Sequence, residues 1–180
     1  MLKIFTGKSC SGKDYQAKKL LEEGYFWLPE CTTRPRRGNE VDGIDKYFYT
    51  DEEYNAAVAR GDIIESRTYN AVWNGTPVAW QYGTPSFDFN KNYVYAIDIL
   101  GVFNLVKNVF TAPDFPSDAV EIIYLDVSDE IRTQRAIARP SYQEAEWLRR
   151  KADDNIKYSE NRIALLENMW GHKVTRVEEN

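Results

Sequence analysis

The stretch FTGKSCSGKDYQAK, residues 5–18, joins the end of an apolar segment to a glycine-rich loop and the start of a helical pattern. Gly7, Gly12 and Lys13 have the spacing G-x-x-x-x-G-K. Glycines let backbone N–H groups point inward, a helix N-terminus adds positive potential, and the lysine adds a full charge. The stretch therefore predicts a phosphate-binding loop between a first strand and a first helix, formed by Gly7, Ser9, Ser11, Gly12, Lys13 and Asp14.

Asp14 stands where this loop pattern normally has Ser or Thr, whose hydroxyl holds Mg²⁺. A carboxylate is also a suitable Mg²⁺ ligand. We therefore expect Asp14 to contact the metal, and we expect the site to depend on it, because a bare carboxylate would repel the phosphates. The alternative is that Asp14 points away and only interacts favourably with the dipole of the first helix.

Strand and helix patterns alternate on either side of this loop. MLKIFT, NYVYAIDIL and AVEIIYLDV read as buried strands, whereas KDYQAKKLLEEG, SDEIRTQRAIAR and one long segment from Tyr142 to Trp170 read as helices. This order predicts an α/β fold with a parallel sheet flanked by helices on both faces. Residues 30–85 hold short strands, one short helix and an Asn-Gly turn, which predicts a small α+β insertion into a core formed by residues 1–29 and 86–180.

Composition narrows the classes of partner. The 180 residues suit a single domain, and the net charge of −5 argues against binding to nucleic acid or to an anionic membrane. No apolar run approaches the ~20 residues of a membrane span, and the first residues lack the apolar core of a signal peptide. Cys10 and Cys31 are too few for a disulfide framework. We expect a cytoplasmic monomer or dimer that binds small molecules.

A second group of cations lies in TTRPRRGNEVDGIDKYF, residues 32–48. Arg34, Arg36 and Arg37 crowd a loop that contains glycine, and guanidinium groups grip phosphate at two points. The alternative is a solvated basic loop. Further arginines follow in RTQRAIAR and LRRK, which either bind phosphate or form solvated helix faces. The single histidine, His172, makes histidine-based catalysis improbable.

The segment TTRPRRGNEVDGIDKYFYTDEEY, followed by GDIIES and YGTP, resembles the guanylate kinases. The resemblance extends over roughly residues 2–177, because GKSCSGKD precedes this segment and YVYAIDILGV and RTQRAIARPS follow it. It implies Mg²⁺-dependent phosphoryl transfer from ATP to GMP or dGMP. Such transfer needs positioned cations and little covalent participation by the protein.

The resemblance also implies roles for individual residues. Arg34 and Arg37 would hold the acceptor phosphate together with Tyr82 and Thr84, and Glu65 and Asp98 would accept hydrogen bonds from the guanine ring. Residues 139–145 would form a lid. The cations that stabilise the transferring phosphoryl group would be Lys13, Arg34, Arg135, Arg139 and Arg150.

Four departures from the family pattern leave the identity of the acceptor substrate open. The first is Asp14. Glu30 stands where the family has a serine. Lys46 replaces a tyrosine that contacts the acceptor phosphate, so either Lys46 or, with the register shifted by one, Tyr47 would bind this phosphate. A longer hairpin, residues 66–81, carries Trp73 and Trp80, which either stack on a base or cover the hairpin's own apolar face. In the strand before Asp98, Ala96 also removes an aspartate common in the family. Two alternatives therefore remain: a kinase for ribose 1,5-bisphosphate, and a non-catalytic binding domain.

Overall fold

The computed structural model describes residues 1–73, 75–113, 115–140, 142–171 and 174–179, so His172 lies outside the described part. Five parallel strands form the main sheet, in the order β2-β7-β1-β8-β9. This arrangement confirms the α/β fold that the alternating pattern predicts. The strands are β1 (Leu2–Gly7), β2 (Phe26–Trp27), β7 (Tyr93–Ala96), β8 (Val120–Val127) and β9 (Val174–Glu179).

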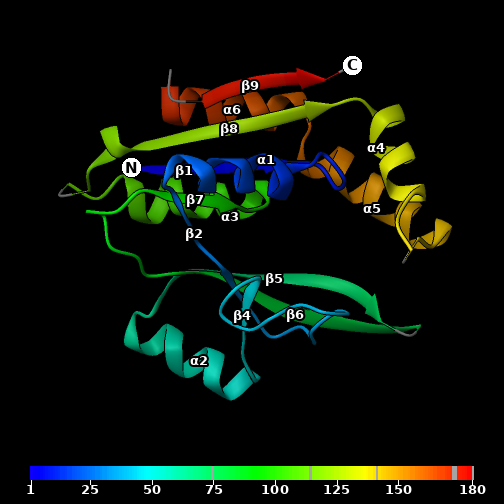
Figure 1. Ribbon diagram of the computed structural model, residues 1–180, viewed down its shortest axis with the longest axis horizontal. Helices are drawn as coiled ribbons and strands as arrows, with labels where there is room; N and C mark the ends of the chain where they lie inside the picture. The colour runs from blue at the N-terminus through cyan, green and yellow to red at the C-terminus, as the bar shows by residue number, and fades with distance from the viewer. Residues whose placement is uncertain (74, 114, 141, 172–173, 180) are drawn as a thin grey trace.

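Helices cover both faces of this sheet (Figure 1). They are α1 (Lys13–Lys19), η1 (Leu20–Glu23), α3 (Ile99–Leu105), the π-helical turn η2 (Val106–Phe110), η3 (Ser117–Ala119), α4 (Asp129–Ile137), α5 (Glu144–Lys157) and α6 (Glu160–Trp170). Leu2 and Ile4 of β1 pack with residues of α3 and α6, whereas Phe5 packs on the other face with Ala17 of α1. The strands are therefore buried on both sides, which explains their near-continuous apolar sequence.

The long helix expected from Tyr142 to Trp170 is wrong, because the chain forms two helices with a break at Tyr158 and Ser159. The reason is a buried polar group. The hydroxyl of Tyr158 accepts a hydrogen bond from the backbone N–H of Ile99 at 3.0 Å. Anchoring Tyr158 to the core in this way lets α5 and α6 run in different directions.

Residues 30–85 form a second sheet of four strands in the order β4-β3-β6-β5, drawn below the parallel sheet in Figure 1. The hairpin of β5 and β6 pairs Trp73 with Thr76, and Asn74 lies outside the described residues. Thr50 and Glu53 form a capping box at the start of α2. The elements are β3 (Glu30–Thr32), β4 (Lys46–Phe48), α2 (Asp51–Arg60), β5 (Ile63–Trp73) and β6 (Thr76–Pro85).

The strand directions place the glycine-rich loop. In Figure 1, β1 and β8 run toward the end of the molecule where α4 and α5 lie. Ligands of open parallel sheets bind beyond the carboxyl ends of the strands. The loop after β1 therefore lies at the expected edge of the sheet. Among the residues described, no helix combines the length and apolarity needed to cross a lipid bilayer.

Candidate active site

The loop between β1 and α1 has a strained, inward-turning backbone. Gly12 has a φ of 88°, and Cys10, with a φ of 62°, is the only non-glycine residue in the described ranges with positive φ. The N–H of Ser11 donates to the carbonyl of Lys8 at 3.1 Å, and α1 begins at Lys13. Strained backbone of this kind concentrates at ligand sites. Within the described part of the chain, the Lys13 ammonium has no ion-pair partner, so its charge is available to a ligand.

Two side chains that the sequence did not single out hold this loop from α4 and α5. Asp154 accepts a hydrogen bond from the backbone N–H of Ser9 at 2.8 Å. Arg132 is fully buried and donates to the carbonyl of Ser9 at 3.1 Å and to Asp154 at 3.2 Å. Charged residues at helical spacing read as a solvated face, so the sequence offered no signal for either. Their network fixes the loop before any ligand arrives.

The three arginines expected to act on the transferring phosphoryl group lie in different surroundings. Arg135 donates to the carbonyl of Ser11 at 3.1 Å and forms an ion pair with Glu179 at 2.6 Å. Arg139 is exposed just beyond the end of α4. Arg150 lies on α5 and donates to Glu146 at 2.7 Å. The expected lid, residues 139–145, connects α4 to α5, and residue 141 lies outside the described part.

Asp14 is exposed in the first turn of α1, and its charge acts on Lys46 of the insertion. Burial lowers the pKa of Lys46 on β4, but the charges of Glu30 and Asp14 outweigh it and raise that pKa overall. Among the described residues, no group of three or more potential ligands could hold a metal alone. Mg²⁺ in nucleotide sites is commonly held by one or two carboxylates together with phosphates. A single free carboxylate beside the loop therefore fits this ion.

The arginine loop presents one anchored and one free guanidinium. Arg34 is only 3% exposed and donates to both oxygens of Glu40, at 2.7 and 2.5 Å. Arg37 is exposed, and desolvation together with the charges of Arg34 and Arg150 lowers its pKa, while Tyr82 opposes this effect. The charges of Arg34 and Arg150 thus both act on Arg37. Three cations gathered in this way attract an anion.

Glu65 and Asp98, the two residues expected to read guanine, are already bonded within the protein. Glu65 is 5% exposed and accepts hydrogen bonds from Thr84 at 3.0 Å and Asn104 at 3.1 Å. Asp98 caps α3 by accepting from the backbone N–H groups of Leu100 and Gly101. Thr84 is fully buried, so its hydroxyl supports Glu65.

Arg67 on β5 joins these carboxylates to Glu30. Its guanidinium donates to Glu65 at 2.8 Å, to Asp98 at 2.9 Å and to Glu30. Lys46 forms an ion pair with the other oxygen of Glu30 at 2.6 Å. Burial works against it, but the three carboxylates raise the pKa of Arg67 well above its usual range. The sequence did not predict Arg67, because an arginine in a hairpin strand looks like a solvent-facing residue.

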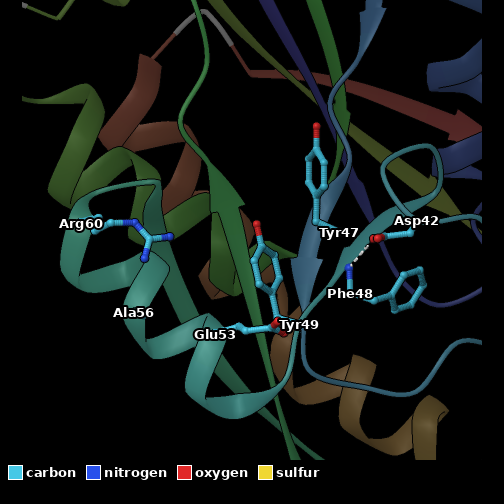
Figure 2. Close-up of a pocket in the computed structure, with 7 residues that line it drawn as sticks. All are labelled: Asp42, Tyr47, Phe48, Tyr49, Glu53, Ala56 and Arg60. Carbon is cyan, nitrogen blue, oxygen red and sulfur yellow. Dashed lines mark hydrogen bonds between the residues drawn. The ribbon is translucent and has the colours of Figure 1, made fainter.

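Lys46 and Tyr47 diverge because successive side chains of a strand point to opposite faces. Lys46 lies with Glu30, whereas Tyr47 lines a separate cavity of about 420 Å³ with Phe48, Tyr49 and residues of α2 (Figure 2). Of the two, only Lys46 joins the other expected acceptor residues. Trp73 and Trp80 pack edge to face, with ring centroids 5.7 Å apart, so they cover the hairpin itself.

The chain is 30% identical over 161 residues to the guanylate kinase of Symbiobacterium thermophilum, covering 83% of this chain and 72% of that protein. The chain belongs to the guanylate kinase family. The guanylate kinase of Clostridium acetobutylicum is 29% identical over 187 residues, covering 98% of this chain and 82% of the relative. A search against protein-family models found no match.

A solved structure supports the fold of this guanylate kinase family member. The crystal structure of guanylate kinase from Anaplasma phagocytophilum matches with a TM-score of 0.58 and 18% identity, covering 100% of this chain and 77% of that chain. In this member of the family, Arg67 lies between the carboxylates of Glu65 and Asp98, because its guanidinium donates to both.

Proposed function

We propose that this chain transfers the γ-phosphoryl group of ATP to GMP or dGMP, giving ADP and the guanosine diphosphate. The observation that carries this proposal is an exposed Arg37 on which the charges of Arg34 and Arg150 both act, in a family member whose glycine-rich loop leaves Lys13 without an ion-pair partner among the described residues. A binding domain without catalysis has no need of either feature.

The donor phosphates would lie on the loop between Gly7 and Lys13. Backbone N–H groups and the start of α1 supply positive potential there, and the Lys13 ammonium adds a full charge. Arg135, already bonded to the carbonyl of Ser11, would reach the same phosphates. Asp14 would hold Mg²⁺, which when bound neutralises charge on the phosphates.

The acceptor phosphate would lie between Arg34, Arg37 and Tyr82. Glu40 keeps the Arg34 fork in place, which reduces the entropy lost when it grips a phosphate. Within the described residues, no hydrogen bond or ion pair restrains the side chain of Arg37, so it can swing toward the ligand. We propose that residues 30–85 are the acceptor-binding insertion.

Closure of the insertion and of residues 139–145 over both nucleotides would exclude water and align the reacting oxygens. Two contacts support such a movement. Lys18 of α1 reaches Asp45 at 3.6 Å, and Arg149 of α5 donates to the hydroxyl of Tyr69 at 3.1 Å. The core therefore touches the insertion on two sides.

We also propose that the protein acts in a reducing compartment, the cytoplasm. Both cysteines are free, and burial raises the pKa of Cys31 to about 12, which keeps it an inert thiol.

An assay of ADP release tests the proposed reaction. ATP and Mg²⁺ are supplied with each acceptor in turn: GMP, dGMP, AMP, CMP, UMP and ribose 1,5-bisphosphate. We expect turnover with GMP and dGMP and none with the sugar phosphate. Turnover with ribose 1,5-bisphosphate alone would keep the fold and overturn the acceptor. Absence of turnover with every acceptor, at several Mg²⁺ concentrations, would overturn the kinase activity.

A further inference from the structure

Arg67 lies at the centre of the expected base-reading group. Its side chain is 8% exposed, and each of its three nitrogens donates to a different carboxylate. The three carboxylates come from separate parts of the chain, namely Glu30 of β3, Glu65 of β5 and Asp98 before α3. The guanidinium therefore ties the insertion to the parallel sheet at the place where a base would be read.

The surroundings are built to hold this side chain. A Cβ atom on Gly101 would lie 2.9 Å from Cζ of Arg67, so only glycine allows this approach. The ring of Tyr82 lies 5.9 Å from the guanidinium on another side. Thr84 and Asn104 meanwhile fix Glu65 through its two oxygens. Arg67 is thus part of the packed site.

A neutral base cannot replace Arg67. Without the guanidinium, Glu30, Glu65 and Asp98 would leave three carboxylates with Lys46 as the one cation bonded to them in the described residues. The ring N–H and the amine of guanine are neutral donors, so they would not compensate the lost charge. We expect Arg67 to stay in place when the acceptor binds.

A guanidinium has five N–H donors, and the three carboxylates use three of them. Two N–H groups remain without a partner among the residues that the structure describes, one on each terminal nitrogen. Arginine binds the carbonyl oxygen and the adjacent ring nitrogen of guanine, O6 and N7, with such a pair of N–H groups. We propose that Arg67 is the specificity-determining residue of the acceptor site and reads the acceptor edge of the base, O6 and N7, through these two donors.

The inference rests on the proposed kinase function and deepens it, because it defines the class of acceptor base. Guanine and hypoxanthine both present a 6-carbonyl and N7, whereas adenine presents a 6-amino donor. The 2-amino group of guanine would contribute little, because Arg67 already pairs Glu65 and Asp98. The acceptors are then 6-oxopurine nucleoside monophosphates in general.

Comparing GMP, IMP and AMP as acceptors tests this inference. In the unaltered chain, we expect kcat/KM for IMP to lie within about threefold of that for GMP, and kcat/KM for AMP to be at least about a hundredfold lower. If Glu65 and Asp98 read the 2-amino group instead, IMP would be at least about a hundredfold worse than GMP, and the role of Arg67 would be overturned while the kinase activity stands.

The double variant E30S/R67A removes one charge of each sign and frees Glu65 and Asp98. We expect the GMP-to-IMP ratio of kcat/KM to rise at least about tenfold, since unpaired carboxylates then depend on the base donors. An unchanged ratio in a folded double variant would contradict the inference, and if that variant does not fold, the ratio in the unaltered chain decides. R60A is the matched control, because Arg60 pairs with Asp62 on the exposed side of α2 and should leave the ratio unchanged.

Equilibrium binding separates this inference from the proposed function. Calorimetric titration with GMP, IMP and AMP, in the presence of ADP, measures the same preference without catalysis. Equal binding of GMP and IMP with weak binding of AMP would support Arg67 even if no acceptor turned over, in which case the kinase activity alone fails. If GMP, IMP and AMP all failed to bind, both the proposed kinase function and the role of Arg67 would be overturned.

Discussion

Arg34 and Arg37 lie in one loop but are restrained differently. The guanidinium of Arg34 is fixed by both oxygens of Glu40, whereas Glu40 bonds only the backbone N–H of Arg37. The side chain of Arg37 therefore contributes little to the folded structure and can serve a ligand. Arg36, between them, pairs with Asp42 at 3.5 Å and is 54% exposed.

The variant R37A should separate binding from folding. We expect KM for the acceptor to rise about tenfold or more, because a charge-assisted bond to phosphate contributes about 1.5–3 kcal/mol. The melting temperature should change by no more than about 2 °C, as for other surface substitutions. Initial-rate kinetics and a thermal melt check both values. R36A serves as the control with unchanged kinetics, and an equal loss in both variants would contradict the assignment of Arg37.

At this scale, the sequence predicted the backbone of the glycine-rich loop, because that depends on local spacing, whereas its binding of phosphate stays a prediction. Gly12 and Lys13 occupy the backbone positions that the pattern required. It could not predict Arg67 or Asp154, because the bonds of Arg67 to Glu30 and Asp98 and that of Asp154 to Ser9 join residues distant in sequence. Ser9 is 145 positions from Asp154, and nothing in local spacing links them.

At the scale of elements, α5 carries residues that organise both proposed phosphate sites. Glu146 binds Arg149 and Arg150, which lie three and four residues further along the helix, at 2.7 Å each. Hydrogen bonds from Arg149, reinforced by Arg150, lower the pKa of Glu146 from 4.5 to about 2, although burial works the other way. One carboxylate thus positions Arg150 beside the acceptor loop and Arg149 beside Tyr69.

The pH dependence of stability should reveal this carboxylate. Because the pKa of Glu146 is lower in the folded state, its ionised form stabilises the fold above about pH 4.5, and the contribution disappears as the pH falls toward 2. We expect E146Q to be about 1 kcal/mol less stable than the unaltered chain at pH 7, after allowance for solvent screening, and the difference to vanish near pH 2. Urea unfolding at pH 7, 5 and 3 measures the free energy of unfolding of both proteins. A difference between them that stays the same at all three pH values would contradict this prediction.

A second element-scale prediction concerns the support of the phosphate loop. Removing Asp154 leaves the fully buried Arg132 short of a partner, which costs about 3 kcal/mol, so the melting temperature of D154A should fall by about 6–12 °C. Asp129 binds the same arginine but is 42% exposed. The melting temperature of D129A should therefore fall by less than about half as much as that of D154A. Equal decreases in the melting temperatures of the two variants would contradict the idea that burial makes the Arg132–Asp154 ion pair the more stabilising one.

The elements themselves were largely predictable. Alternating apolar strands and helical segments indicated the parallel sheet, and the short strands, short helix and Asn-Gly turn of residues 30–85 indicated the second sheet. The continuous helix from Tyr142 failed because its apolar spacing persists through Tyr158. Only the tertiary bond from Ile99 to that hydroxyl identifies the break.

At the scale of the whole molecule, two sheets carry two halves of one proposed site. The phosphate loop belongs to the parallel sheet, and the arginine loop follows β3 of the smaller sheet. The ion pair of Lys18 with Asp45 and the bond of Arg149 to Tyr69 connect them. Ligands that contact both halves should therefore stabilise the entire chain.

Ligand-dependent melting tests this coupling. ATP with Mg²⁺, at about a hundredfold above its Kd, should add about 2.7 kcal/mol and raise the melting temperature by about 5–10 °C. In K13A the shift should be abolished, because the loop loses its lysine charge. R36A again provides the control with the full shift. A shift retained in K13A would place ATP away from this loop.

Transfer of label from [γ-³²P]ATP to GMP, with Mg²⁺ and with products separated by chromatography, tests the central claim most directly. The account predicts that label appears in the β-phosphate of GDP with the unaltered chain and is lost in K13A. Label that stays in ATP, or that is released as inorganic phosphate while GMP remains unchanged, would contradict a phosphoryl transfer between the two loops.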